Sequence, residues 1–67
     1  MDYRTIESRM QQMVGGAEMI TYKGIMKYTG RSRGWVKVHI ADSGIKSFGT
    51  GSGQVFHIHD IAKMLGE

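Results

Sequence analysis

The chain has 67 residues, no cysteine, and nine basic against six acidic side chains, which gives a net charge of +3. A chain this short forms one domain with a small core, and without cysteine it holds neither a disulfide nor a thiolate metal site. No apolar run reaches the roughly 18 residues that a membrane span needs, and the N-terminus lacks a signal-peptide pattern. We therefore expect a cytoplasmic protein without a membrane segment. The chain stops directly after its last predicted helix, which is also compatible with one domain of a longer protein.

Residues 2–14 are predicted to form an amphipathic helix. Apolar side chains recur there at helical spacing and share one face: Tyr3, Ile6, Met10, Met13 and Val14. Asp2 suits the N-cap, and Gly15-Gly16 ends the helix and forms a hinge. We therefore separate residues 1–19, an amphipathic helix with its hinge, from a domain at 20–67. The apolar face of this helix either packs within the molecule or forms a homodimer.

Two further helices are predicted at 21–28 and 32–42, joined by a turn at Thr29-Gly30-Arg31. Thr21 and Ser32 are the expected N-caps. The second of these segments is ambiguous. Residues 35–40 alternate in polarity and are rich in β-branched side chains, so periodicity alone also allows a strand.

The C-terminal third is predicted to contain a β-hairpin followed by a helix. Residues 45–48 and 54–58 have the composition of strands, and the loop between them, 49–53, is rich in glycine. Asp60 is the expected N-cap of a last helix at 60–65. The apolar aromatic side chains Trp35, Phe56 and Tyr28 are expected in the core.

Basic side chains gather in the centre of the chain. Between Thr21 and Lys46 only Asp42 opposes a basic set that includes Lys23, Lys27, Arg31, Arg33 and Lys37. Such a concentration of positive charge is typical of a surface that binds a polyanion such as nucleic acid.

An ordered set of short motifs spans about two-thirds of the chain. The motifs are Ile20-Thr21, Gly30-Arg31-Ser32-Arg33, Val36 with Ile40, Gly44-Ile45-Lys46, Phe56, and Asp60-Ile61 with Leu65. Together they resemble the excisionase and MerR-like winged helix-turn-helix superfamily, and they are similar to the DNA-binding domains of terminase small subunits. Two residues depart from that pattern: Trp35 stands where a small or polar residue is usual, and Gly34 weakens the first turn of its helix.

The resemblance implies a mainly α fold with a small β-hairpin, a winged helix-turn-helix with an extra N-terminal amphipathic helix. It favours a helix over residues 35–40 and implies that this helix enters the major groove of double-stranded DNA. The residues expected to contact bases are Arg31, Arg33, Gly34 and Lys37. Those expected to contact the DNA backbone are Lys23, Lys27, Ser32, Lys46, Thr50 and Ser52.

The expected function is that of a sequence-specific DNA-binding regulator from a phage or mobile element. It would act as an excisionase-type factor or as a small repressor that controls transcription, including that of its own gene. A protein-interaction module with a basic face is the alternative, and it requires a three-stranded β core that includes residues 35–40. Binding of structured RNA is a third reading, although the sequence lacks a stacking-aromatic signature.

Catalysis and cofactor binding are not expected. His57 and His59 would share one face of the predicted strand, but the sequence places no third ligand beside them, and His39 is distant. No paired carboxylates or Ser/His/Asp arrangement is present, and so short a chain makes a poor pocket for a small-molecule substrate. The glycine-rich loop lacks the Gly-Lys-Ser/Thr ending of a nucleotide-binding loop. It is expected either to contact DNA as a wing tip or to serve as a flexible turn.

Overall fold

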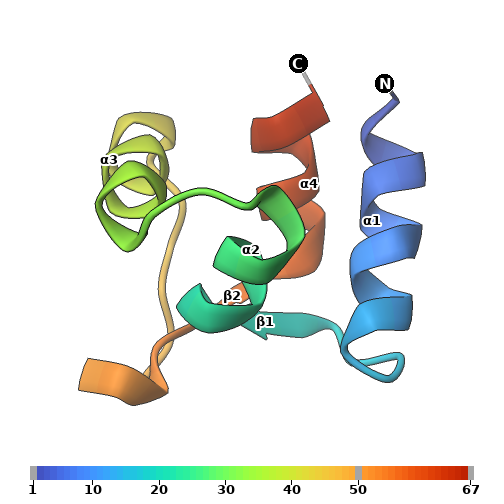
Figure 1. Ribbon diagram of the computed structural model, residues 1–67, viewed down its shortest axis with the longest axis horizontal. Helices are drawn as coiled ribbons and strands as arrows, with labels where there is room; N and C mark the ends of the chain where they lie inside the picture. Colours follow the sequence, from blue (N-terminus) through green and yellow to red (C-terminus); the bar gives the residue numbers. More distant parts are fainter. Residues whose placement is uncertain (1, 50, 67) are drawn as a thin grey trace.

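The computed structural model of the chain describes residues 2–49 and 51–66. Within these residues it contains four α-helices, a short antiparallel sheet of two strands and one 3-10 turn (Figure 1). In chain order the elements are α1 (Tyr3–Met13), β1 (Met19–Thr21), α2 (Tyr22–Thr29), α3 (Arg33–Ser43), η1 (Gly51–Gly53), β2 (Val55–His57) and α4 (Ile58–Gly66). The prediction of a mainly helical fold with a small amount of antiparallel β-structure is confirmed.

The ambiguous segment at 35–40 is helical and lies inside α3. Ser32 caps this helix, because its hydroxyl oxygen accepts a hydrogen bond from the backbone N–H of Trp35 at 3.2 Å. Val36 and Ile40, one turn apart, are both buried. The three-stranded β core that the alternative function required is therefore not formed.

The sheet is built differently from the predicted hairpin. β1 pairs with β2, with Met19 opposite His57 and Thr21 opposite Val55. The prediction located the strand at 55–57 but gave it the wrong main partner, since residues 45–48 contribute only the bridge between Phe48 and Val55. The backbone at residue 45 still belongs to the end of α3, because the Ile45 N–H donates to the Ile40 carbonyl at 3.3 Å and is not used in a strand ladder.

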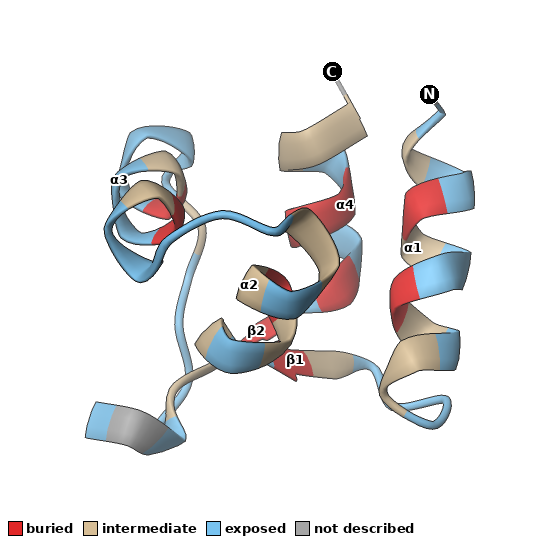
Figure 2. Ribbon diagram, viewed as in Figure 1, coloured by how far each residue is buried: buried red, intermediate tan, exposed pale blue. Residues whose placement is uncertain are grey.

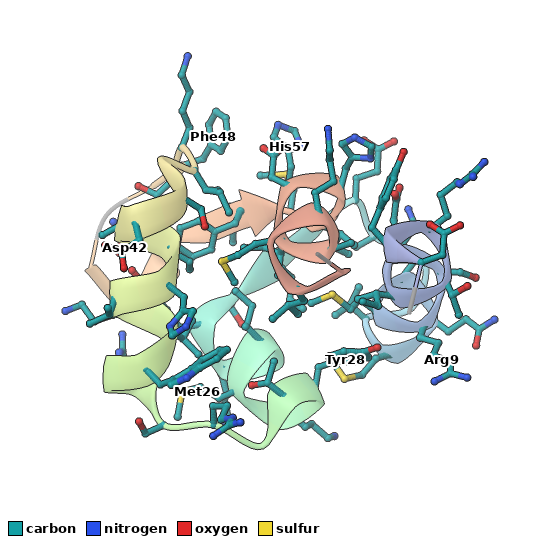
Figure 3. The ribbon with its side chains drawn as sticks, turned by 90° about the horizontal axis from the view of Figure 1, so that it is seen from above. Arg9, Met26, Tyr28, Asp42, Phe48 and His57 are labelled. Carbon is teal, nitrogen blue, oxygen red and sulfur yellow. The ribbon has the colours of Figure 1, made fainter. Side chains whose placement is uncertain are left out.

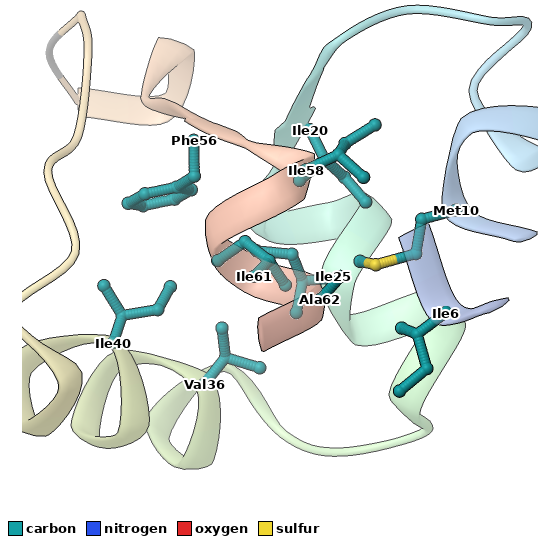
Figure 4. Packing of buried hydrophobic residues seen from close by; sticks show 10 residues of the cluster. All are labelled: Ile6, Met10, Ile20, Ile25, Val36, Ile40, Phe56, Ile58, Ile61 and Ala62. Carbon is teal, nitrogen blue, oxygen red and sulfur yellow. The ribbon is translucent and has the colours of Figure 1, made fainter. Parts of the chain in front are cut away.

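The core draws on all four helices and both strands. Figure 2 shows the buried positions of each helix on the side that faces the middle of the molecule. The buried set is Ile6, Met10, Ile20, Ile25, Val36, Ile40, Phe56, Ile58, Ile61 and Ala62, and Figure 4 shows these side chains directed toward one another. Phe56 is a core residue as expected. Trp35 and Tyr28 are not, because both are half-buried and pack against the edge of the core.

Helix α1 lies alongside α4 and belongs to the same core (Figure 1). Ile6 and Met10, on its predicted apolar face, are buried. The other apolar positions on that face, Tyr3, Met13 and Val14, are half-buried against the core. The apolar face of this helix is thus used within the molecule.

Helix α4 starts two residues earlier than predicted, because β2 passes directly into it at Ile58, so Asp60 lies in its first turn and is not its N-cap. His57 therefore lies in the strand and His59 in the helix, so the predicted common strand face does not exist. The Nδ1 atom of His59 lies 3.0 Å from Oε1 of Glu7 and joins α4 to α1. Among the described residues, no helix is long and apolar enough to cross a membrane.

Candidate nucleic-acid interface

Helices α2 and α3 are joined by a short turn whose hydrogen bonds are all local. Gly30 ends α2 in the left-handed conformation, which glycine adopts without strain, and its N–H donates to the Met26 carbonyl at 2.8 Å. The Thr29 hydroxyl donates to the Ile25 carbonyl at 2.8 Å and accepts from the Arg31 N–H at 3.2 Å. Ser32 then caps α3. These bonds fix the direction in which α3 leaves the turn.

The two faces of α3 differ sharply. Val36 and Ile40 are turned into the core, whereas the four residues predicted to contact bases are all exposed around the N-terminal half of the helix. These four are Arg31, Arg33, Gly34 and Lys37. Val38 lies on the same exposed stretch and retains 56% of its surface. Val38 was not among the predicted contact residues, although its position one turn after Gly34 indicates that it shares the outer face.

Two aromatic rings lie beneath the arginines of this surface. The guanidinium carbon of Arg31 is 5.2 Å from the centre of the Trp35 ring, and that of Arg33 is 5.1 Å from the centre of the Tyr22 ring. Both distances fall within the range of cation–π contacts. Sequence reasoning assigned Trp35 to the core and gave no role to Tyr22. The spacing of four residues between Arg31 and Trp35 is the one signal that would have paired them.

The predicted backbone-contacting residues are only partly brought together. Lys23 lines the same surface hollow as Arg33 and Tyr22, at the start of α2. Lys27 is exposed in the last turn of α2. Ser32 is exposed, but its hydroxyl is engaged as the cap of α3. Lys46 lies beyond the other end of α3, whose last residue, Ser43, is roughly 15 Å along the helix axis from Arg33.

The predicted wing is a loop closed by a few hydrogen bonds. The backbone groups of Phe48 and Val55 exchange hydrogen bonds of 2.9 and 2.8 Å, and the Gln54 amide donates to the Ser47 hydroxyl at 3.3 Å. The Phe48 ring also packs edge-on against His57 at 5.1 Å between centres (Figure 3). Two predicted contacts, Thr50 and the side chain of Ser52, lie outside the described residues.

The histidines do not assemble a metal site in the described part of the chain. His57 and His59 line one hollow together with Glu7, Gln11 and Glu18, between α1 and the sheet. No group of three or more histidine, aspartate or glutamate side chains in residues 2–49 and 51–66 has the geometry to hold a metal ion. His39 is on α3, where its Nδ1 lies 2.9 Å from the Trp35 carbonyl oxygen.

The chemistry of this surface is that of a donor-rich helix end. An arginine presents a planar fork of N–H donors, which matches guanine O6 and N7 or a pair of phosphate oxygens. An α-helix with its side chains is about 10–12 Å wide, close to the width of the major groove of DNA.

Comparisons of the chain with protein-family models, with curated proteins and with solved structures find no match.

Proposed function

We propose that the protein binds double-stranded DNA in a sequence-specific manner, as a winged helix-turn-helix whose helix α3 enters the major groove. The difference between the buried and the exposed face of α3 is the observation that supports DNA binding most directly. Its inner positions, Val36 and Ile40, are buried, while Arg33 and Lys37 lie on the exposed side directly after a short turn from α2. A recognition helix needs this arrangement, because its N-terminal side chains must reach base edges while its other face anchors it.

In this proposal Arg31, Arg33, Gly34 and Lys37 face the bases, and Lys23 and Lys27 contact phosphates next to the groove. The loop between Phe48 and Val55 acts as the wing, with Lys46, Thr50 and Ser52 along the DNA backbone. The resemblance stated above favours a phage or mobile-element regulator, either an excisionase-type factor or a small repressor. The proposed function does not include a homodimer formed through α1, because the apolar face of α1 packs against α4.

Fluorescence anisotropy tests DNA binding directly. The labelled duplexes come from DNA flanking the protein's own gene, because small regulators of mobile elements often bind there, and a duplex of random sequence serves as the reference. We expect Arg33→Ala to cost about 1–3 kcal/mol on the specific duplex and clearly less on the random one. Arg4→Ala is the matched control, since Arg4 is a largely exposed arginine on α1, away from the proposed interface.

Two results contradict the proposal in different ways. If the unaltered protein binds no duplex at any salt concentration, it is not a DNA-binding protein. If Arg33→Ala loses affinity equally on specific and random DNA, Arg33 contacts the backbone and does not read bases. A loss of the same size for Arg4→Ala would show that net charge alone drives binding.

A further inference from the structure

Each of the two arginines at the start of α3 has its guanidinium carbon over an aromatic ring. The guanidinium carbons of Arg31 and Arg33 lie 5.2 and 5.1 Å from the ring centres beneath them. Neither guanidinium forms a salt bridge with any acidic side chain in the described part of the chain. The aromatic rings are therefore the groups that hold these two side chains.

The ring beneath Arg31 is itself held in place. The Trp35 ring stacks on the His39 imidazole, with 3.8 Å between the centres and 23° between the planes. His39 is fixed in turn by its contact with the Trp35 carbonyl oxygen. Trp35 and His39 are both half-buried, and Trp35 packs against the core.

The ring beneath Arg33 is anchored from the core. The Tyr22 ring packs edge-on against Phe56, with 5.0 Å between the centres and 75° between the planes. Phe56 has no exposed surface and lies among the core side chains (Figure 4). A continuous series of contacts therefore runs from the core through Tyr22 to Arg33.

Stacking on a ring prepares an arginine for recognition in two ways. It removes side-chain freedom before DNA is bound, so that less is lost when the contact forms. It also holds the side chain without a carboxylate partner, so the N–H donors that do not face the ring stay available. A guanidinium held in this way presents its donors to a base edge in a defined orientation.

We propose that Trp35 and Tyr22 are positioning residues, which orient Arg31 and Arg33 and thereby set how well the protein discriminates between DNA sequences. This role rests on the proposed function, because it concerns the same surface and the same ligand. The positioning role adds to the interface two residues that touch no base. It also gives Trp35, which departs from the family pattern, a part in recognition instead of in the core.

The first test needs no DNA. Ring currents shift protons that lie over an aromatic ring upfield, so the Arg31 side-chain resonances should be displaced in the NMR spectrum of the unaltered protein. Trp35→Leu should return them to ordinary positions, while Trp35→Phe, which keeps a ring, should retain part of the shift. The same comparison for Arg33 uses Tyr22→Leu and Tyr22→Phe. Thermal melts of all four variants identify any that fail to fold.

The second test measures sequence discrimination, as the ratio of the dissociation constants for random and specific duplexes. Trp35→Leu should lower this ratio about two- to fivefold, the factor that corresponds to one exposed cation–π contact. Trp35→Phe should stay close to the unaltered protein. Arg31→Ala combined with Trp35→Leu should lose no more than Arg31→Ala alone, because the ring acts through that arginine. Trp35→Leu combined with Lys37→Ala, the control pair, should show additive losses.

The outcomes separate the positioning role from DNA binding itself. If the unaltered protein binds specific DNA and the losses for Arg31→Ala and Trp35→Leu are additive, the positioning role is overturned. The proposed function then remains intact. Arg31 resonances at ordinary positions in the unaltered protein would overturn the positioning role as well. Absence of binding to every duplex would overturn both the proposed function and the positioning role.

Discussion

A Cβ atom at Gly66 would lie 2.7 Å from the Cα atom of Tyr3, so the last turn of α4 is in backbone contact with the first turn of α1. The Tyr3 ring also packs edge-on against His59, with 5.7 Å between the ring centres. Further along α1, Ile6 and Met10 enter the common core. The two ends of the described chain thus lie side by side (Figure 1).

Replacing Gly66 with alanine tests this close approach. The added methyl group would meet the backbone of Tyr3, which cannot turn away as a flexible side chain would, so α1 must shift. We expect Gly66→Ala to lower the free energy of unfolding by about 1–3 kcal/mol, as overpacking commonly does. Gly53→Ala is the control, because a Cβ atom there meets nothing within 4 Å. A Gly66→Ala protein that melts at or above the unaltered temperature would show that the helix ends are not in contact.

Two helical glycines should respond to the same substitution with opposite signs. A Cβ atom at Gly24 would lie 2.7 Å from Cγ1 of the buried Ile20, whereas at Gly34 the nearest atom would be the Ser32 hydroxyl oxygen, at an ordinary contact distance of 4.0 Å. Gly34→Ala should therefore stabilise the protein by up to about 1 kcal/mol through helix propensity. Gly24→Ala should destabilise it, because the overpacking exceeds that gain. Chemical denaturation of both variants measures the difference, and a shift of the same sign in both would contradict it.

Gly34→Ala should also separate stability from binding. The residue lies between Arg33 and Trp35 on the exposed side of α3, so an added methyl group would face the DNA in the proposed complex. We therefore expect the Gly34→Ala variant to bind DNA more weakly than the unaltered protein, although it resists unfolding better. Anisotropy titrations beside the denaturation curves check this pair of effects. Unchanged affinity would mean that Gly34 does not approach the DNA closely.

Lys27→Ala should weaken binding to all DNA sequences alike. Lys27 is exposed at the end of α2, where it is proposed to contact a phosphate, and each such contact releases a counterion. The slope of log K against log salt should become shallower by about one unit. Lys63→Ala on α4 removes the same charge from an exposed position beside α1 and should leave the slope nearly unchanged. Equal changes in slope for both lysines would contradict the assignment.

Met10→Ala tests how the apolar face of α1 is used. Met10 has no exposed surface, and truncating a buried methionine costs about 2–5 kcal/mol of stability. The melting temperature should drop by the same amount at low and high protein concentration, because the contacts are within one molecule. Melts over a wide range of concentrations distinguish this from dimerisation, in which the melting temperature would rise with concentration.

The starts of α1, α2 and α3 could be predicted because their signals are local. The Asp2, Thr21 and Ser32 side chains each accept a backbone N–H within the first turn, as N-caps do. Periodicity alone left residues 35–40 ambiguous; once the resemblance favoured a helix there, helical spacing put Arg33 and Lys37 on the side away from the buried Val36 and Ile40.

The rest depended on contacts between distant parts of the chain. Strand β1 is too short to show a period of its own, and it exists because Val55–His57 pairs with it from far along the sequence. Tyr22 lies under Arg33 only once α2 and α3 have taken their places, so no spacing rule connects the two residues. The start of α4 at Ile58 was hidden because the strand runs into the helix without a turn.

The antiparallel pairing of β1 with β2 also determines the order in which the molecule can be completed. The turn between α2 and α3 closes through bonds between near neighbours, which form quickly. The partners of β1 and α1, by contrast, are β2 and α4, which lie far along the sequence, so Met10 is covered only when α4 is present. During synthesis the turn between α2 and α3 can therefore close early, whereas α1 gains its packing partner only after α4 has been made.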